Sequence, residues 1–413
     1  MRKRLTLLVS AFLIVGLTLG TSYTHSVSAT VPGINQLMNT DASGTYGNGG
    51  FNSGIGGGAS YLSGDGRYVV FDSTATNLVT GDTNGYSDVF VKDTSIGSIT
   101  LASLTSSGAQ VTDNTFAKGI SYDGRYVLFA RGASLNFLYV RDLTNNTTTT
   151  ICSSLNGCAT YGMKGGAISA DGKYVTYANL DYPGHKYQAI VFNVQTGVRK
   201  TLSVDSAGNL GNADSYPGGI SCDGGVISFS SYATNLPGGA GGYIATFDLD
   251  GTLQLTKVNI SQSSQVSCDG NVIVSGYFSF PNSASIYNRL TNQSTTLVTG
   301  SVSSISVSND GRFVALTSQL NLDSSYPSTG AGSYYDAYVI DMKNSTTQLI
   351  SFTVAGNKSG KVYAPVSISG DGSKVSYGYV TPSNADPTHE LISGVNTGTS
   401  TTQKDIYTSK TGF

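Results

Sequence analysis

The four-residue pattern Ser-x-Asp-Gly occurs seven times in this 413-residue chain and limits its fold more strongly than any other feature. The seven copies end at Gly66, Gly124, Gly172, Gly224, Gly270, Gly311 and Gly372. The intervals between them are 58, 48, 52, 46, 41 and 61 residues, with a mean of 51. Repetition at this period is typical of arrays in which each unit is one supersecondary structure.

Each copy predicts the turn of a β-hairpin, because Asp can accept hydrogen bonds from the backbone just ahead and Gly tolerates positive φ. Strand-like runs follow the glycines, as in Arg67 to Phe71 and Arg312 to Leu316. One carboxylate per repeat at the same turn indicates a structural role rather than an acidic active-site ring. The carboxylates concerned are Asp65, Asp123, Asp171, Asp223, Asp269, Asp310 and Asp371.

Two more strands follow most of these hairpins. A third strand often ends in Asp, as in residues 88–93 and 137–142, and a fourth leads to the next repeat, as in residues 98–104. Four strands in about 50 residues is the size of a propeller blade. We therefore predict an all-β, seven-bladed β-propeller of four-stranded antiparallel blades.

The two ends of the chain together complete the last predicted blade. After the seventh motif, Asp405 to Thr408 matches a third strand, and too few residues follow for a fourth. A spare strand-like segment, Ile34 to Asn39, precedes the first motif and parallels the fourth strand at 200–205. We predict that this N-terminal segment pairs with Asp405 to Thr408, which closes the ring and covers its open edges.

These repeats resemble those of the bacterial TolB-like propellers, which are also described as WD-repeat-like. The resemblance rests on the run Ser63 to Phe71, on Ala75 to Val79, on Gly81 to Gly85 and on Asp88 to Val91. It covers nearly the whole chain after residue 29 and implies a fold, while the family's repeats serve many roles. TolB itself carries an additional N-terminal domain, so the resemblance is to the repeat family and not to TolB itself.

The N-terminus has the features of a secretory signal peptide. A cationic start at Arg2, Lys3 and Arg4 precedes an apolar run from Leu5 to Gly20, and Val27-Ser28-Ala29 fits the cleavage site. We predict a signal peptide over residues 1–29 and the propeller over residues 30–413. The mature chain is then secreted, periplasmic or at the cell surface, with no membrane insertion after cleavage.

Charge argues against two classes of partner. Without residues 1–29 the chain keeps 20 basic and 25 acidic residues, a net charge of −5. Nucleic acids and anionic membranes are bound by clustered Lys and Arg, so we expect neither as a partner. We expect a monomer that binds a protein or glycan ligand.

The even number of cysteines in an exported chain predicts disulfides. Cys152 and Cys158 flank a short turn-prone loop and are natural partners. Cys222 and Cys268 occupy the x position of Ser-x-Asp-Gly in neighbouring repeats, and the sequence leaves open whether they bond across blades.

Sequence motifs for catalysis do not appear after the predicted signal peptide. That part holds two histidines, His185 and His389, both in loop-like stretches, and has no nucleophile elbow, zinc-protease motif or phosphate-binding loop. The glycine-rich segment 238–242 is interpreted as a flexible loop. We predict no catalytic residue and a non-enzymatic binding or scaffold module. The alternative is a propeller-fold enzyme that acts on polysaccharide, as a lyase or glycosidase.

One segment has the oxygen donors that calcium prefers. Asp82, Asn84 and Asp88 surround a glycine at position 85, which suits a hard cation, although the downstream Glu of an EF-hand loop is missing. The other interpretation is a connection rich in Asx turns. Calcium is the only cofactor for which the sequence gives an argument.

The chain contains 26 tyrosines and no tryptophan. Tyrosines within strands are expected to pack between blades, whereas loop tyrosines could stack on sugars or contact a protein. The loop tyrosines are Tyr182, Tyr187, Tyr216, Tyr326, Tyr334 and Tyr335.

Overall fold

The computed structural model describes residues 36–50, 60–132, 137–153, 158, 163–181, 184–248, 251–261, 263–277, 283–325, 335–351, 362–380 and 404–413. Within these ranges it contains 28 β-strands and no helix long and apolar enough to cross a membrane. The predicted signal peptide, residues 1–29, lies outside the described residues.

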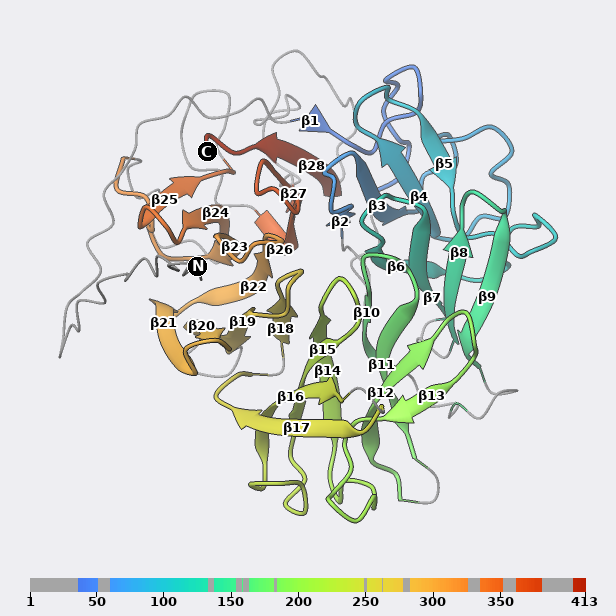
Figure 1. Cartoon of the computed structure of the whole chain (residues 1–413). Coiled ribbons are helices and arrows are strands. Elements are labelled where there is room, and N and C mark those ends of the chain that lie inside the picture. Colours follow the sequence, from blue (N-terminus) through green and yellow to red (C-terminus); the bar gives the residue numbers. More distant parts are fainter. Residues whose placement is uncertain are drawn as a thin grey trace, which may run out of the picture.

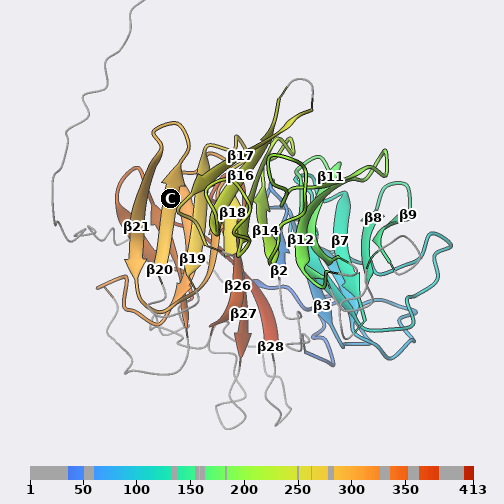
Figure 2. The same cartoon turned by 90° about the horizontal axis from the view of Figure 1, so that it is seen from below.

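The strands form seven four-stranded antiparallel sheets arranged in a ring, which confirms the predicted seven-bladed β-propeller (Figure 1). We number the blades I to VII from the sheet that contains the first Ser-x-Asp-Gly motif. Blades I to VI are each built from four consecutive strands, and blade VII has the order β26-β27-β28-β1. In a view perpendicular to the axis of the ring, most strands run roughly along that axis (Figure 2).

The innermost strands are β2 (Ser60–Leu62), β6 (Thr115–Ile120), β10 (Lys164–Ile168), β14 (Ser215–Ile220), β18 (Ser263–Val266), β22 (Val302–Val307) and β26 (Val362–Ile368). The second strands are β3 (Tyr68–Ser73), β7 (Tyr126–Arg131), β11 (Tyr174–Leu180), β15 (Val226–Ser231), β19 (Val272–Tyr277), β23 (Phe313–Ser318) and β27 (Lys374–Val380). The third strands are β4 (Asp88–Asp93), β8 (Phe137–Asp142), β12 (Tyr187–Asn193), β16 (Gly241–Phe247), β20 (Ser283–Asn288), β24 (Asp336–Asp341) and β28 (Lys404–Lys410). The outer strands are β5 (Ile99–Leu101), β9 (Thr147–Cys152), β13 (Arg199–Thr201), β17 (Leu253–Val258), β21 (Gln293–Thr299), β25 (Thr346–Leu349) and β1 (Gln36–Leu37).

The ring closes as the sequence predicts. Gln36 pairs with Thr408 and Leu37 pairs with Tyr407, so the N-terminal strand is the outer strand of blade VII. Met38 follows directly, is fully buried, and packs with Phe71 in the core between blades VII and I.

Second strands are buried on both faces because each lies between two neighbouring blades. In β3, Val69 and Phe71 belong to the core shared with blade VII, whereas Val70 belongs to the core shared with blade II. In β7, Val127 and Leu128 divide in the same way. Since successive side chains of a strand point to opposite faces, a run of consecutive apolar residues supplies two blade junctions at once.

The Ser-x-Asp-Gly motif is the turn between the first and second strands of every blade. In blade I, the Ser63 hydroxyl donates to the Asp65 carboxylate at 2.5 Å and accepts the Tyr68 backbone N–H at 2.9 Å. Asp65 also accepts the Arg67 backbone N–H at 2.9 Å, and Gly66 has a φ of 68°. The same bonds recur in the other six turns, so these carboxylates have the structural role that the sequence indicated.

One loop prediction is partly wrong. The sequence predicts a flexible loop over 238–242, but Gly241 and Gly242 are the first residues of β16. A Cβ on Gly242 would lie 2.4 Å from the carbonyl oxygen of Ile260. Glycine is present there because a neighbouring chain segment approaches closely, and not because the segment needs freedom.

Candidate functional site

The x positions of the seven motifs form a ring around one end of the central channel. The residues at these positions are Gly64, Tyr122, Ala170, Cys222, Cys268, Asn309 and Gly370, and all of them line the channel. Backbone hydrogen bonds join neighbours around the ring, for example from Gly370 to Gly64 at 2.8 Å and from Asn309 to Gly370 at 2.8 Å. A Cβ on Gly64 would lie 2.1 Å from the Tyr122 ring, so the packing of Tyr122 against this turn requires glycine at position 64.

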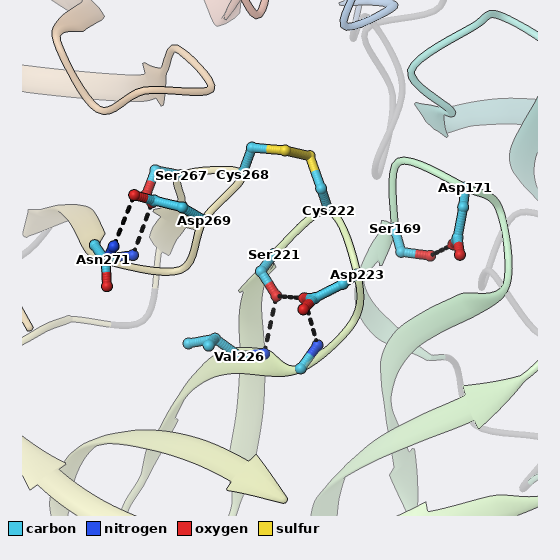
Figure 3. The surroundings of a disulfide bond; sticks show 11 residues. Ser169, Asp171, Ser221, Cys222, Asp223, Val226, Ser267, Cys268, Asp269 and Asn271 are labelled. Carbon is cyan, nitrogen blue, oxygen red and sulfur yellow. Dashed lines mark hydrogen bonds between the residues drawn. A yellow bond between two sulfur atoms is a disulfide. The ribbon is translucent and has the colours of Figure 1, made fainter.

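The structure places both cysteine pairs at disulfide-bonding distance. Cys152 and Cys158 close a local loop, with Cα atoms 5.5 Å apart. Cys222 and Cys268 have Cα atoms 4.5 Å apart and join the motif turns of blades IV and V (Figure 3). The Cys222 N–H also donates to the Cys268 carbonyl at 3.0 Å. The pairing that the sequence left open therefore forms a covalent link between two blades.

The central channel has a cavity volume of about 470 Å³, within the range of roughly 300–1,000 Å³ that is common for small-molecule sites. Hydroxyl and amide side chains form much of its lining, including Ser304, Ser306, Ser367 and Gln265. Among the described residues that line it, Lys118 has the only charged side chain.

A β-bulge in β6 brings Lys118 into the lining of the channel. Ala117 pairs with Phe129 and Gly119 with Leu128, so Lys118 is the extra residue of the bulge. Bulges of this kind redirect a side chain. The β-strand pattern of the sequence gave no sign of this residue, because a bulge leaves no mark in a short apolar strand.

A buried carboxylate, Asp72 on β3, lies close to Lys118. Asp72 is fully buried and accepts the Ala117 backbone N–H at 3.4 Å. Burial lowers the pKa of Lys118, and the negative charge of Asp72 opposes this effect. Burial and the same charge raise the pKa of Tyr61, which also lines the channel. Asp72 therefore balances the ammonium of Lys118 from within the wall.

A second group of candidate residues lies where blades III and IV meet. The rings of Tyr187 and Tyr216 are 5.6 Å apart, and the Tyr216 hydroxyl donates to Asp214 at 3.1 Å. Burial and the neighbouring Asp214 raise the pKa of the Tyr216 hydroxyl, and Tyr232, which is 58% exposed, lies close enough to contribute. We call Tyr187, Asp214, Tyr216 and Tyr232 the tyrosine cluster. Tyr187 and Tyr216 are half-buried, and Tyr232 is the exposed ring of the cluster. Tyrosines beside a carboxylate at a surface can stack on sugars or anchor a protein while the carboxylate accepts hydrogen bonds.

Of the tyrosines that the sequence predicts in loops, Tyr187 and Tyr216 lie close together, but the loop prediction is wrong for both, since Tyr187 is the first residue of β12 and Tyr216 lies in β14. Tyr335 lies elsewhere and bridges to Val362. Tyr182, Tyr326 and Tyr334 lie outside the described residues.

His185 is exposed, with a φ of 53°, in the turn between β11 and β12. Its backbone N–H donates to Asp181 at 3.1 Å. This matches the loop position expected from the sequence. His389 lies outside the described residues.

The three predicted calcium ligands belong to a hydrogen-bonded network. Asn84 donates to Asp88 at 2.7 Å and to the Val111 carbonyl at 3.0 Å, and Ser103 donates to the other Asp88 oxygen. Asp82 is 8% exposed and lies near enough to raise the pKa of Asp88. A calcium ion at Asp88 would have to replace both of these donors, so the calcium site stays a prediction.

Two other blades have an equivalent network, with a glutamine in place of the aspartate in blade III and with the same Ser–Asp pair in blade VI. In blade III, Ser203 donates to Gln188 at 2.6 Å, and Gln188 donates to the Gly211 carbonyl at 2.9 Å. In blade VI, Ser351 donates to Asp336 at 3.0 Å. The side chain at the position of Asp88 therefore holds the start of the third strand in place. In blade III, Gln188 has this role, so a carboxylate is not required for it.

We expect the Asp88 carboxyl to make stability depend on pH. Burial raises its pKa to about 6, so the folded state holds a proton that the unfolded state releases near pH 4. The free energy of unfolding should therefore fall as pH rises from about 4 through 6, by on the order of 2–3 kcal/mol. Unfolding measured across this range should show a flatter profile for Asp88→Asn. An unchanged profile in that variant would contradict the assignment.

Comparisons with known proteins concern the fold alone. No known family profile matches the chain, and no curated protein sequence matches it. Similar solved structures include TolB from Acinetobacter baumannii, at 16% identity and a TM-score of 0.42, over 63% of this chain and 58% of that one. A putative TolB from Agrobacterium tumefaciens is 14% identical, with a TM-score of 0.42 over 76% of this chain and 94% of that one. The β-propeller domain of Cps50 (Swd1) from Myceliophteria thermophila is 10% identical, with a TM-score of 0.49 over 87% of this chain and 98% of that one.

Proposed function

We propose that this chain is an exported, non-enzymatic binding module and that the tyrosine cluster contacts its ligand, a glycan or a protein. The observation that carries the proposal is the contact between the rings of Tyr187 and Tyr216 where blades III and IV meet. The Asp214 carboxylate accepts a hydrogen bond from Tyr216, and the exposed Tyr232 lies beside them. Rigid aromatic side chains bury a large area at a small entropic cost, which suits a recognition surface.

Two further features support the proposal. A closed propeller is a stiff frame that holds strand ends and the loops beside them in fixed positions, and binding residues are commonly carried there. The two cysteine pairs at disulfide-bonding distance favour an oxidising compartment, in agreement with the predicted signal peptide. Secretion and a cell-surface or periplasmic location belong to the same proposal.

The test is a binding screen of the mature, oxidised protein against a glycan array and a panel of purified extracellular proteins. For a ligand found there, we expect Tyr232→Ala to weaken binding by about 3–10-fold, as for the loss of one aromatic contact. Tyr86→Ala is the matched control, since Tyr86 is 41% exposed but lies in blade I, away from the cluster.

Two results would contradict the proposal. Equal weakening by Tyr232→Ala and Tyr86→Ala would remove the tyrosine cluster from the binding surface. Turnover of a polysaccharide that one point substitution abolishes would instead favour the enzymatic alternative.

A further inference from the structure

The central channel contains a second candidate site, separate from the tyrosine cluster. Its lining combines one ammonium, Lys118, with serine hydroxyls from blades VI and VII, and the described lining residues contribute no carboxylate to the channel. Because a cavity of about 470 Å³ is large enough for a small molecule, the chemistry of this lining defines which ligand would fit.

The serine hydroxyls are held in place by the backbone of neighbouring strands. Ser304 accepts the Val366 N–H at 2.9 Å, and Ser367 accepts the Leu62 N–H at 3.1 Å. Ser306 accepts the Ile368 N–H at 3.3 Å. Each of these hydroxyl groups has an oxygen engaged by a backbone donor and retains its own hydrogen to donate. The wall therefore presents hydrogen-bond donors at fixed positions.

Lys118 adds a positive charge to these donors. The β-bulge of β6 places it in the channel lining, and the fully buried Asp72 balances its charge from inside the wall. An ammonium has three N–H donors, more than one carboxylate normally engages, so Lys118 can bind an oxygen anion from the channel while it remains close to Asp72. In a narrow channel with low-dielectric walls, such a charge-assisted bond is stronger than in water.

The geometry points to a binding site for a small polyhydroxylated carboxylate, such as a sugar acid, in the central channel, with Lys118 bonded to the carboxylate and the serines to ligand hydroxyls. This inference gives the protein a small-molecule site beyond the proposed recognition surface. It does not depend on the tyrosine cluster, since the two sites share no residue.

The test uses isothermal titration calorimetry on the native, oxidised chain with two matched probes, D-glucuronate and the neutral D-glucuronamide. We expect saturable binding of glucuronate at millimolar concentration or below, and binding of glucuronamide at least about tenfold weaker, because one charge-assisted bond is lost. This comparison needs no substitution and so holds even if variants fold poorly.

Substitutions then assign the charge to one residue. Lys118→Met should abolish glucuronate binding, and Lys118→Arg should retain part of it. Lys164→Met is the control, because Lys164 is an exposed lysine on the neighbouring strand β10 that does not line the channel. The Tyr232→Ala variant should bind glucuronate normally, which separates this site from the proposed recognition surface.

The inference is overturned if glucuronate shows no saturable binding at millimolar concentration, or if the two probes bind equally well. It is also overturned if folded Lys118→Met binds glucuronate like the native chain. Failure of the glycan and protein screen, by contrast, would leave these titrations unaffected.

Discussion

Deletion of residues 30–40 is expected to destabilise the whole propeller, by more than about 5 kcal/mol in the free energy of unfolding. The deletion removes β1 and its pairing with β28, so that blade VII loses its outer strand. It also removes the fully buried side chain of Met38 from the core between blades VII and I. In addition, Lys92 loses the Thr40 oxygens to which its ammonium donates at 2.8 and 3.1 Å. Chemical denaturation followed by circular dichroism measures the loss.

Two alanine substitutions, one in the core and one on the surface, test whether the lost stability comes from the packing of Met38. Met38→Ala should cost about 2–4 kcal/mol because it leaves a cavity in a closed core. Ile96→Ala should be nearly neutral, since Ile96 is 71% exposed in the turn between β4 and β5. Deletion of 238–242 is unsuitable as a control because it would cut into β16. A truncated protein that unfolds at the same denaturant concentration as the full chain would contradict ring closure.

Loss of the Cys222–Cys268 bond is expected to destabilise the protein more than loss of the Cys152–Cys158 bond. The first closes a chain segment of 46 residues and the second one of 6. The entropy of the unfolded chain then gives about 4 kcal/mol for the first bond and about 2 kcal/mol for the second.

The packing between blades IV and V is a second reason to expect that loss of the Cys222–Cys268 bond costs more stability. Within the described residues, the apolar core of this junction contains five buried side chains, whereas the cores of the other junctions contain seven to twelve. The five are Val226, Ile244, Ile260, Ile273 and Tyr287. The covalent bond therefore lies where the least apolar burial holds neighbouring blades together.

Unfolding of Cys222→Ala/Cys268→Ala should be compared with that of Cys152→Ala/Cys158→Ala in the same denaturant. Reductant should lower the midpoint of the native chain towards that of the first variant. If both variants lose the same stability, or if the first matches the native chain, the bond between blades does not have the role assigned to it.

The blade pattern could be predicted from sequence because its signal is local. A Ser, an Asp and a Gly at fixed spacing determine each turn through bonds among residues close in sequence, as in the Ser63–Asp65 contact. The closing strand could be predicted for a related reason: the last repeat lacked its outer strand and the N-terminus offered a spare one.

The candidate sites could be predicted only in part, because they depend on contacts between blades. The residue type at the x position varies among the motifs, yet backbone hydrogen bonds join most of the neighbouring turns around the channel. Lys118 reaches the channel through a bulge that the strand pattern hides. Tyr187 and Tyr216 are 29 positions apart in the sequence, and their proximity follows from the packing of β12 in blade III against β14 in blade IV.

The most direct test of the closed ring is a cross-link between its two ends. Gln36 and Thr408 are register partners in blade VII, and directly opposed residues of antiparallel strands have Cβ atoms roughly 5 Å apart, close to the range of a disulfide. The variant Gln36→Cys/Thr408→Cys should form a third disulfide on oxidation, detected by peptide mass spectrometry, while Gln36→Cys/Lys410→Cys should not. A closed ring predicts efficient cross-linking of the first pair alone. Free thiols at both positions of the first pair in the folded, oxidised protein would contradict it.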